Sequence, residues 1–409
     1  MNKIWHKKPP HMHNANVEAT LAYIDQHWAD LLYKNTQDTG TLIGLPHDYI
    51  VPAAQADAQF NFEEQYYWDT YFILLGLNDQ KYSQLAKGML ENLVALYKRF
   101  HMIPNASRLY FLSRSQPPLL TSMILLYKET FGCSGEWFDE MMAIAEDEYT
   151  TVWMSTKHPH WRKIGQLNRY YDINALHDLA EAESGWDMTP RFDRKCLDYY
   201  PIDLNSLLYK YEKDFADWYR TKNDLKTAAL WDNKAQKRAQ IVDELLWGHV
   251  RKFYFDYNFE DEKRGLTWSL AGFYPMWVGM VDDKKAKELV KQLGKFEKDG
   301  GLSTTSRPMI NLSLLFGSVK TQWAYPNGWA PLQWIVIKGL ERYGYTEDAN
   351  RLAKKWLKTC TDWYATHGVL LEKYNVVTPT REPIKGVYPS QTGFGWTNGI
   401  YVALARDYA

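Results

Sequence analysis

The hydrophobic positions of this chain recur every three or four residues through several long segments, a pattern that predicts amphipathic α-helices. These segments lie at 17–34, 82–100, 204–221, 234–248, 285–296, 330–344 and 347–360. Strand-like alternation of hydrophobic and polar residues is scarce. Long stretches rich in Gly, Pro, Asn and Trp separate the helical segments, for example at 108–118, 321–331 and 386–399. Loops of this composition on a helical scaffold are where binding groups usually lie.

The pattern predicts an all-α fold in one large domain. At 409 residues the chain exceeds the usual size of a single hydrophobic core, but helical toroids remain one domain at this length. No low-complexity linker or charge block divides the sequence. We therefore expect one domain over residues 1–409, with residues 1–14 as a flexible N-terminal segment. The expected architecture is an (α/α)6 toroid, a double ring of paired helices whose long active-site loops meet at one mouth.

The charge balance limits the partners. Lys plus Arg number 48 and Asp plus Glu number 49, for a net charge of −1, so no long-range field attracts nucleic acid or an anionic membrane surface. The N-terminus lacks an apolar signal region, and no stretch approaches the roughly 20 apolar residues of a membrane span. Cys133, Cys196 and Cys360 lie far apart, which favours neither disulfides nor a CxxC metal site. We expect a cytoplasmic protein that binds neither nucleic acid nor membranes.

Histidine pairs occur at 11–13 and 158–160. A metal site needs further ligands in a defined geometry, and neither pair has an obvious set nearby. We expect surface histidines, with no metal and no cofactor. The aromatic content is unusual, with 18 Trp and 29 Tyr. Trp and Tyr combine an apolar face with a polar edge, which suits stacking on sugar rings, although large helical cores also use them.

Five stretches combine carboxylates, amides, guanidinium groups and aromatic rings. They are 60–72, 103–118, 182–192, 322–334, and 370–376 together with 393–399. In this order they resemble the motifs of the trehalase family of glycoside hydrolases, over most of the chain from about residue 50. The resemblance implies an inverting glycosidase that cleaves α,α-trehalose, with Asp187 of the ESGWD motif as general acid and Glu372 of the EKY motif as general base.

Two carboxyl groups far apart in sequence suit glycosidic hydrolysis. One protonates the leaving oxygen, and the other activates water on the opposite face of the sugar. The Gly and Trp before Asp187 allow a sharp turn and exclude water, which favours the protonated acid. The alternative interpretation makes Asp187 the N-cap of a helix over 188–193 and Glu372 a solvated surface charge.

The resemblance also implies a set of substrate-binding residues. Aromatic faces, amides and a planar guanidinium group hold sugar rings and hydroxyl groups. Core packing is the alternative for the two Trp residues of this set, and a structural ion pair is the alternative for its Arg. The expected residues are Phe62, Tyr66, Trp68, Asp69, Asn105, Arg114, Gln116, Gly185 and Trp329.

The chain also departs from the family pattern. Asn61 stands in place of an Arg, Ala324 in place of an Asp, and Val387 in place of a Glu. The segment between 172 and 183 lacks an RPES motif. These changes fall on groups that grip and cover the substrate, so another small α-glucoside could replace trehalose. A noncatalytic carbohydrate-binding relative is the second hypothesis. We expect a monomer that binds a small disaccharide or α-glucoside.

Overall fold

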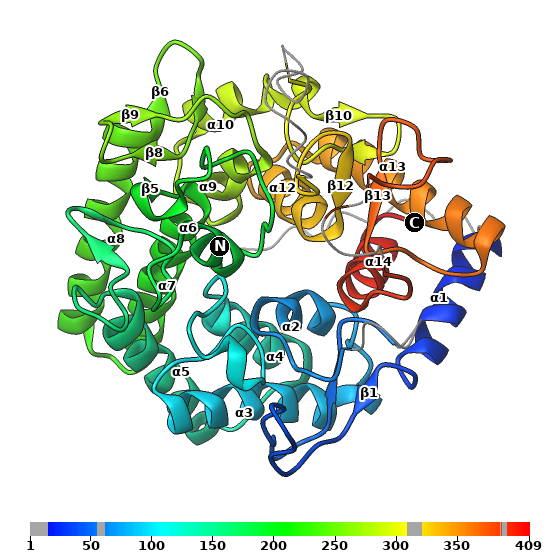
Figure 1. The fold of residues 1–409 in the computed structure, drawn as a ribbon, viewed down its shortest axis with the longest axis horizontal. Coiled ribbons are helices and arrows are strands. Elements are labelled where there is room, and N and C mark those ends of the chain that lie inside the picture. Colours follow the sequence, from blue (N-terminus) through cyan, green and yellow to red (C-terminus); the bar gives the residue numbers. More distant parts are fainter. Residues whose placement is uncertain (1–14, 55–61, 309–320, 385, 387–390) are drawn as a thin grey trace.

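Paired α-helices form the framework of the structure, a computed structural model that describes residues 15–54, 62–308, 321–384, 386 and 391–409. The chain runs once around a ring, and the colours of Figure 1 follow it from α1 round to α14. Helices of an inner layer contact their neighbours around the ring: α2 contacts α4, α7 contacts α9, α9 contacts α12, and α12 contacts α14. The ring closes where α14 contacts α2. The expected (α/α)6 toroid is confirmed.

The helices of the inner layer are α2 (Tyr67–Leu74), α4 (Leu120–Phe131), α7 (Ile202–Thr221), α9 (Tyr274–Trp277), α12 (Ala330–Arg342) and α14 (Gly395–Tyr408). Those of the outer layer are α1 (Ala15–His27), α3 (Ser83–Phe100), α5 (Gly135–Glu148), α8 (Leu225–Leu246), α10 (Asp283–Val290) and α13 (Thr346–His367). Helix α6 (His177–Glu183) precedes a loop on the side of the site. Short helical turns lie at Gln80–Tyr82, Leu109–Phe111, Tyr149–Trp153, Cys196–Asp198, Leu270–Phe273 and Leu293–Lys295.

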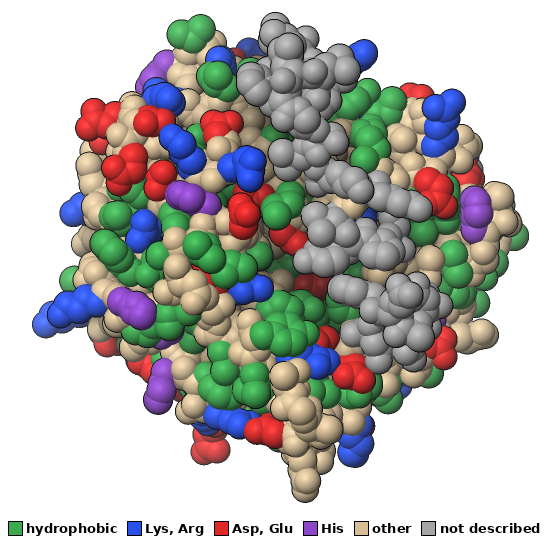
Figure 2. Space-filling model, viewed as in Figure 1, with side chains coloured by type: hydrophobic (Ala, Val, Ile, Leu, Met, Phe, Trp, Pro, Cys, Tyr) green, Lys and Arg blue, Asp and Glu red, His purple; other side chains and the backbone are tan. Residues whose placement is uncertain are grey.

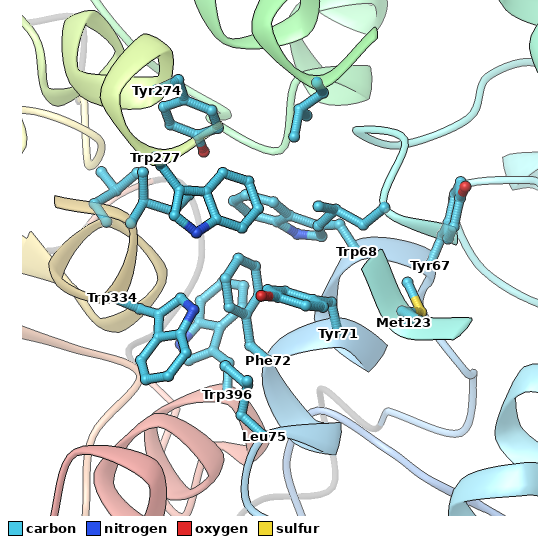
Figure 3. Packing of buried hydrophobic residues seen from close by; sticks show 14 of the residues in the cluster. Tyr67, Trp68, Tyr71, Phe72, Leu75, Met123, Tyr274, Trp277, Trp334 and Trp396 are labelled. Atoms are coloured by element: carbon cyan, nitrogen blue, oxygen red, sulfur yellow. The ribbon is translucent and has the colours of Figure 1, made fainter. Parts of the chain in front are cut away.

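Aromatic side chains fill the space inside the ring. Figure 3 shows Trp68 and Tyr71 of α2 among the rings of α9, α12 and α14. The Tyr71 and Trp277 centroids lie 6.0 Å apart, and those of Trp68 and Trp396 lie 5.9 Å apart. Helices α14 and α2 approach so closely that a Cβ at Gly399 would lie 2.1 Å from the carbonyl oxygen of Phe72. The inner helices therefore pack on several sides at once.

The strands of the described residues are two or three residues long and pair antiparallel. One ladder matters for the site: β12 (Asn327–Trp329) pairs with β13 (Lys373–Asn375), with Trp329 opposite Lys373. It joins the start of α12 to the loop before α14. The other pairs are β1 (Leu32–Tyr33) with β2 (Tyr49–Ile50), β3 (Lys163–Ile164) with β4 (Leu167–Asn168), β5 (Tyr199–Tyr200) with β8 (Tyr257–Asn258), β8 with β9 (Lys263–Arg264), β6 (Trp247–Gly248) with β7 (Phe253–Tyr254), and β10 (Glu297–Lys298) with β11 (Gly301–Leu302).

Each of the seven segments predicted as helical contains a helix, but two predictions extended too far. The helix predicted over 17–34 ends at His27, where a turn leads to β1. The helix predicted over 285–296 ends at Val290, and a separate turn covers Leu293–Lys295. Buried apolar residues follow both helices, Trp28 and Leu31 after the first and Leu293 and Phe296 after the second, so their spacing continued the helical pattern.

Two absences hold for the part of the chain that the structure describes. None of its helices is both long and apolar enough to span a membrane. None of its His, Cys, Asp and Glu side chains gather in a group of three or more that could hold a metal ion. The histidine pair at 11–13 and the whole segment 1–14 lie outside the described residues.

Candidate active site

The expected acid, Asp187, lies in a bend that follows α6. No helix starts at Asp187 in the described chain, so the interpretation of Asp187 as an N-cap is wrong. Two contacts from a distant segment fix the bend. The side-chain amide of Gln322 donates to the backbone carbonyl oxygen of Asp187 at 2.6 Å. The backbone N–H of Trp323 donates to the carbonyl oxygen of Met188 at 3.1 Å. The 322–323 segment therefore sets the position of Asp187.

Gly185 is required two residues before the acid. Its φ of 75° lies in the left-handed region, which favours glycine. A Cβ at this position would lie 2.8 Å from two carbon atoms of the Trp68 ring. The turn before Asp187 is thus pressed against the indole of α2, and the two expected site residues Gly185 and Trp68 are in contact.

A cluster of indole rings lies beneath the bend. The Trp323 and Trp329 rings stack 3.8 Å apart at an interplanar angle of 3°, and Trp186 stacks on Trp323 at 5.5 Å. Trp68 and Trp396 join them at 5.9 Å from Trp323 and 5.8 Å from Trp329, respectively. Trp68 and Trp329 are 2% and 1% exposed. They therefore pack in the core and also support the segments that carry the carboxyl groups.

A buried ion-pair network holds the chain beyond the bend. Arg191 is fully buried and pairs with Asp203 at 2.7 Å and with Asp256 at 2.8 Å. Its guanidinium carbon lies 4.4 Å from the centre of the Trp186 ring. Two carboxylates around one buried guanidinium group satisfy its donors. Arg191 therefore anchors the bend to α7 and does not reach the site.

Glu183, the last residue of α6, joins the bend to the 103–118 loop. Its buried carboxylate accepts hydrogen bonds from Arg162 at 2.5 Å and 2.9 Å. It also accepts from the backbone N–H groups of Ser115 at 2.9 Å and Tyr171 at 3.1 Å. A fully satisfied buried carboxylate of this kind rigidifies the segments that it connects.

The 103–118 loop brings two expected site residues to the start of α2. The side-chain oxygen of Gln116 accepts from the backbone N–H of Trp68 at 2.9 Å. It caps α2, because the N-cap residue Tyr66 makes no capping hydrogen bond through its own side chain within the described part of the chain. The side-chain amide of Asn105 donates to the carbonyl oxygen of Ser115 at 3.0 Å. The backbone carbonyl oxygen of Asn105 accepts from the N–H of Tyr67 at 3.2 Å. The Gln116 side chain and the Asn105 backbone thus contact the start of α2, which carries Trp68 and Asp69.

Arg114 is partly satisfied by protein. Its Nη1 lies 3.5 Å from a carboxylate oxygen of Asp172, which also accepts from Ser113 at 2.7 Å. The structural ion pair considered for Arg114 is therefore present. Its Nε is buried and has no hydrogen-bond partner among the residues that the structure describes, a costly state that a ligand oxygen would relieve. Because its charge also acts on Asp187, Arg114 lies near the acid.

The expected base, Glu372, comes directly before β13. Its backbone is fixed on both sides: the N–H donates to Gln391 at 3.0 Å, and the carbonyl oxygen accepts from the Trp396 indole at 3.0 Å. The side chain is 15% exposed and pairs with the fully buried Lys373 at 2.5 Å. The interpretation of Glu372 as a solvated surface charge is therefore wrong.

Three carboxyl groups face one another across the site. The pKa of Asp187 is raised to about 7, mainly by burial and further by the negative charge of Glu372, while Arg114 and Lys373 act in the opposite direction. The pKa of Asp69, at the start of α2, is raised to about 8, mainly by burial and to a smaller extent by the charges of Glu372 and Asp187. Desolvation is the larger cause in both cases. Near neutral pH the protonated forms of Asp69 and Asp187 are therefore populated.

Two further expected residues line the same region. Phe62 packs edge-on against Tyr66 at 5.9 Å and against Phe394 at 6.0 Å. Burial raises the pKa of Tyr66 well above its usual value, and the charges of Glu64, Asp69 and Asp187 contribute. The Tyr66 hydroxyl is therefore a neutral hydrogen-bond donor beside the carboxyl groups. The structure brings all eleven expected residues into one region of the inner ring.

Of the three departures noted in the sequence, Asn61 and Val387 lie outside the described residues. Ala324 is buried, at 8% exposure, one residue beyond Trp323. Figure 2 shows acidic and hydrophobic side chains near the centre of the face that it presents. Ala324 thus follows the segment that fixes Asp187.

Sequence reasoning did not single out several residues that shape the site. Gln322, Lys373 and Glu183 lie inside the stretches given above, and Lys373 directly follows the selected Glu372. Their position in those motifs was the available signal. Arg162 lies in none of the five stretches, and its pairing with Glu183 becomes visible only when the chain is folded.

Comparisons with known proteins identify the family and the fold. A family model described as Trehalase matches residues 3–183 and 174–409. The neutral trehalase Nth1 from Saccharomyces cerevisiae shares 29% sequence identity with this chain. Its structure matches with a TM-score of 0.75, and the match covers 96% of this chain and 80% of the trehalase chain. A GH63 mannosylglycerate hydrolase from Thermus thermophilus is 16% identical, with a TM-score of 0.67 over 94% of this chain and 99% of that one. A rhamnosidase from Klebsiella oxytoca is 10% identical, with a TM-score of 0.60 over 97% of this chain and 64% of that one. The last two likenesses concern the fold alone.

Proposed function

The chain belongs to the trehalase family of glycoside hydrolases, and we propose that it hydrolyses α,α-trehalose to glucose with Asp187 as general acid and Glu372 as general base. The observation that carries this proposal is the unequal environment of the two carboxyl groups. Burial raises the pKa of Asp187 to about 7, whereas Glu372 forms an ion pair with Lys373. Groups whose environments differ in this way divide into an acid and a base.

The proposed reaction is a single displacement. Asp187 gives its proton to the glycosidic oxygen as the bond from that oxygen to the anomeric carbon breaks. Glu372 takes a proton from a water molecule whose oxygen bonds to the same carbon from the opposite face. One glucose leaves in the β form and the other in the α form, and both carboxyl groups return to their starting states by proton exchange with solvent.

The aromatic and amide groups around the carboxyls form the proposed glucose site. Trp68 and Trp329 supply apolar walls, and Gly185 lets the backbone approach the sugar. Arg114 has a buried N–H donor with no partner in the described part of the chain, and a hydroxyl oxygen would satisfy it. Phe62 supplies a further apolar face at the rim. The remaining proposed hydroxyl partners are Tyr66 at the rim and Asp69, Asn105 and Gln116 at the start of α2.

Replacement of the two carboxyl groups tests the assignment. We expect Asp187→Asn and Glu372→Gln each to lower kcat on trehalose by about 10²–10⁴-fold, because both changes keep the shape and remove the proton transfer. Asp243→Asn is a control of the same chemistry, since Asp243 lies on the outside and contacts Tyr254 and Lys285. Near-normal turnover by either site variant contradicts the assignment.

The anomeric form of the first products tests inversion. Proton NMR at the start of the reaction should detect α- and β-glucose in equal amounts before mutarotation mixes them. Release of α-glucose alone, or a glucosyl group covalently attached to the protein, contradicts the single displacement.

The buried Ala324 bears on the choice of substrate. If Ala324 replaces a group that grips trehalose, each lost charge-assisted hydrogen bond weakens binding by about 1.5–3 kcal/mol in a dry site. Ala324→Asp should then lower KM for trehalose. If the site instead fits another α-glucoside, the same change damages activity on that substrate. KM and kcat on trehalose, kojibiose and glucosylglycerol separate these two possibilities.

A noncatalytic carbohydrate-binding relative is the second hypothesis. Presence of both Asp187 and Glu372 favours the enzyme, because a binding protein needs no acid and base pair. Glucose release from a panel of disaccharides decides between them, and binding without release supports the second. We also propose that residues 1–409 form one catalytic domain that acts as a monomer in the cytoplasm, consistent with the closed ring and with three free cysteines.

A further inference from the structure

Lys373 is a completely buried cation in direct contact with Glu372. Its Nζ lies 2.5 Å from Oε2 of Glu372, and the two side chains are 0% and 15% exposed. Nζ also lies 4.8 Å from the centre of the Trp329 ring, which faces it across the β12–β13 ladder. An ammonium group buried in this way requires a charged or hydrogen-bonding partner, and Glu372 is that partner.

We propose that Lys373 is a positioning residue that keeps Glu372 ionised and holds its carboxylate in one orientation. Of the three carboxyl groups in the site, Glu372 therefore acts as the base. The inference rests on the proposed function, because it concerns the base of that reaction. It assigns to Lys373 a task that neither sugar binding nor core packing requires.

The charged groups around Glu372 come from several elements. Asp69 faces it from the start of α2, and Asp187 faces it from the bend after α6. Arg114, on the 103–118 loop, acts on Asp187. Asp69 and Asp187 have no direct contact with an ammonium group among the described ion pairs, whereas Glu372 does. A contact with a cation favours the charged form of a carboxyl group, so Lys373 distinguishes Glu372 from the other two.

The backbone contacts leave the orientation of the carboxylate to Lys373. The peptide groups of Glu372 are held by Gln391 and by the Trp396 indole. The side chain itself has three rotatable bonds beyond this fixed backbone, and the Lys373 contact restrains its end. A base must keep hydrogen-bond distance to its water molecule, so a loose carboxylate would act poorly even when ionised.

The pH dependence of two neutral variants tests the proposal. In Lys373→Met, the acidic limb of the kcat/KM profile should move upward by about one pH unit or more, the size expected when a carboxyl group loses an adjacent cation. On the acidic side of the profile, the activity of Lys373→Met is then about tenfold or more below that of the wild type. At alkaline pH the loss is smaller. Lys373→Gln, which keeps a hydrogen-bond donor, should shift in the same direction and replaces the Met variant if that one does not fold. Lys373→Arg keeps the charge and should keep the limb near that of the wild type.

Carbon-13 NMR of side-chain carboxyl groups gives a readout that does not depend on turnover. The Glu372 signal is identified by its loss in Glu372→Gln, and it should titrate at higher pH in the Lys373→Met protein than in the wild type. Equal titration in both proteins, or an equal loss of activity at every pH, overturns the proposal. If the wild type cleaves no sugar of the panel, the proposed function fails, but the titration still decides the role of Lys373.

Discussion

Gly185→Ala is the sharpest test of the geometry around the acid. The new methyl group meets two energetic costs. Alanine at a φ of 75° costs about 1 kcal/mol. Its Cβ would lie 2.8 Å from the Trp68 ring, and crowding in a packed core costs about 1–3 kcal/mol. The Trp68 ring cannot move aside freely, because the rings of Phe72, Trp323 and Trp396 surround it.

The expected loss of stability is therefore about 2–4 kcal/mol. For a chain of 409 residues, each 1 kcal/mol lowers Tm by roughly 1 °C, because the entropy of unfolding is about 2.1 cal/mol/K per residue. Relief of the contact needs a movement of roughly half an ångström close to Asp187. Since a displacement of about 1 Å can cost about 10²-fold in rate, we expect kcat on the best substrate to fall about tenfold.

Gly344→Ala is the matched control. Gly344 has a φ of 78°, a Cβ at this position would have nothing within 4 Å, and the residue lies in the exposed turn between α12 and α13. The Gly344→Ala variant meets only the cost of alanine at a positive φ. Its Tm should therefore fall by about 1 °C, and its kcat should stay normal. Calorimetry and initial rates on both variants give the comparison. If Gly185→Ala is as stable and as active as the control, the contact with Trp68 does not position the acid.

Three further predictions follow from the buried charges. The kcat/KM of the wild type should fall as pH rises above about 7, where Asp187 loses its proton, and a flat profile between pH 6 and 9 would count against Asp187 as acid. The folded pKa of Asp187 is raised from 3.8 to about 7, so its contribution to stability is present below pH 4 and is lost as pH rises to about 7. Asp187→Asn should therefore be more stable than the wild type at pH 8 by about 1–3 kcal/mol in urea unfolding, with no gain at pH 4. Arg162→Met leaves the buried Glu183 without its ion-pair partner and should lose about 3–5 kcal/mol, and an unchanged urea midpoint would show that the pair is not needed.

Helices with one buried and one exposed face could be predicted from the sequence, in the outer layer and in part of the inner layer. The patterns at 82–100 and 204–221 agree with α3 and α7 within two residues. The short inner helices α2 and α9 gave no such pattern. All eight residues of α2 are buried, as are all four of α9, so their polar and apolar residues show no period of 3.6. Burial on every side removes the signal on which the prediction depends.

The candidate site was predictable only as a set of motifs. Asp187 and Glu372 could be selected from the resemblance, but 185 positions separate them along the chain, and no local pattern reports that they face each other. The contacts that position them also join distant segments: Gln322 reaches Asp187, and Arg162 reaches Glu183. Ring closure brings these segments together, and that is a property of the whole fold.

The net charge of the site leads to a last prediction, which concerns the charge of the substrate. Near pH 6, Asp69 and Asp187 are largely protonated, since burial raises the pKa of Asp69 to about 8 and that of Asp187 to about 7. The Lys373 charge is balanced by Glu372, and the Arg114 charge by Asp172. These described groups therefore sum to about zero and leave no cation to pair with an anionic sugar derivative, whose desolvation would go uncompensated.

An uncharged α-glucoside fits this balance better than an anionic one. We expect kcat/KM for trehalose and glucosylglycerol to be at least about tenfold higher than for mannosylglycerate, which carries a carboxylate. The reason is that one unpaired buried charge costs more than about 1.4 kcal/mol, which corresponds to a tenfold change in rate. Because mannosylglycerate also differs in its sugar, glucosylglycerate is the matched substrate: it differs from glucosylglycerol mainly in the carboxylate. Comparable kcat/KM values for these two at pH 6 would mean that a cation outside the named groups meets the carboxylate, and the charge balance drawn from Asp69, Asp187, Glu372 and Lys373 would be wrong.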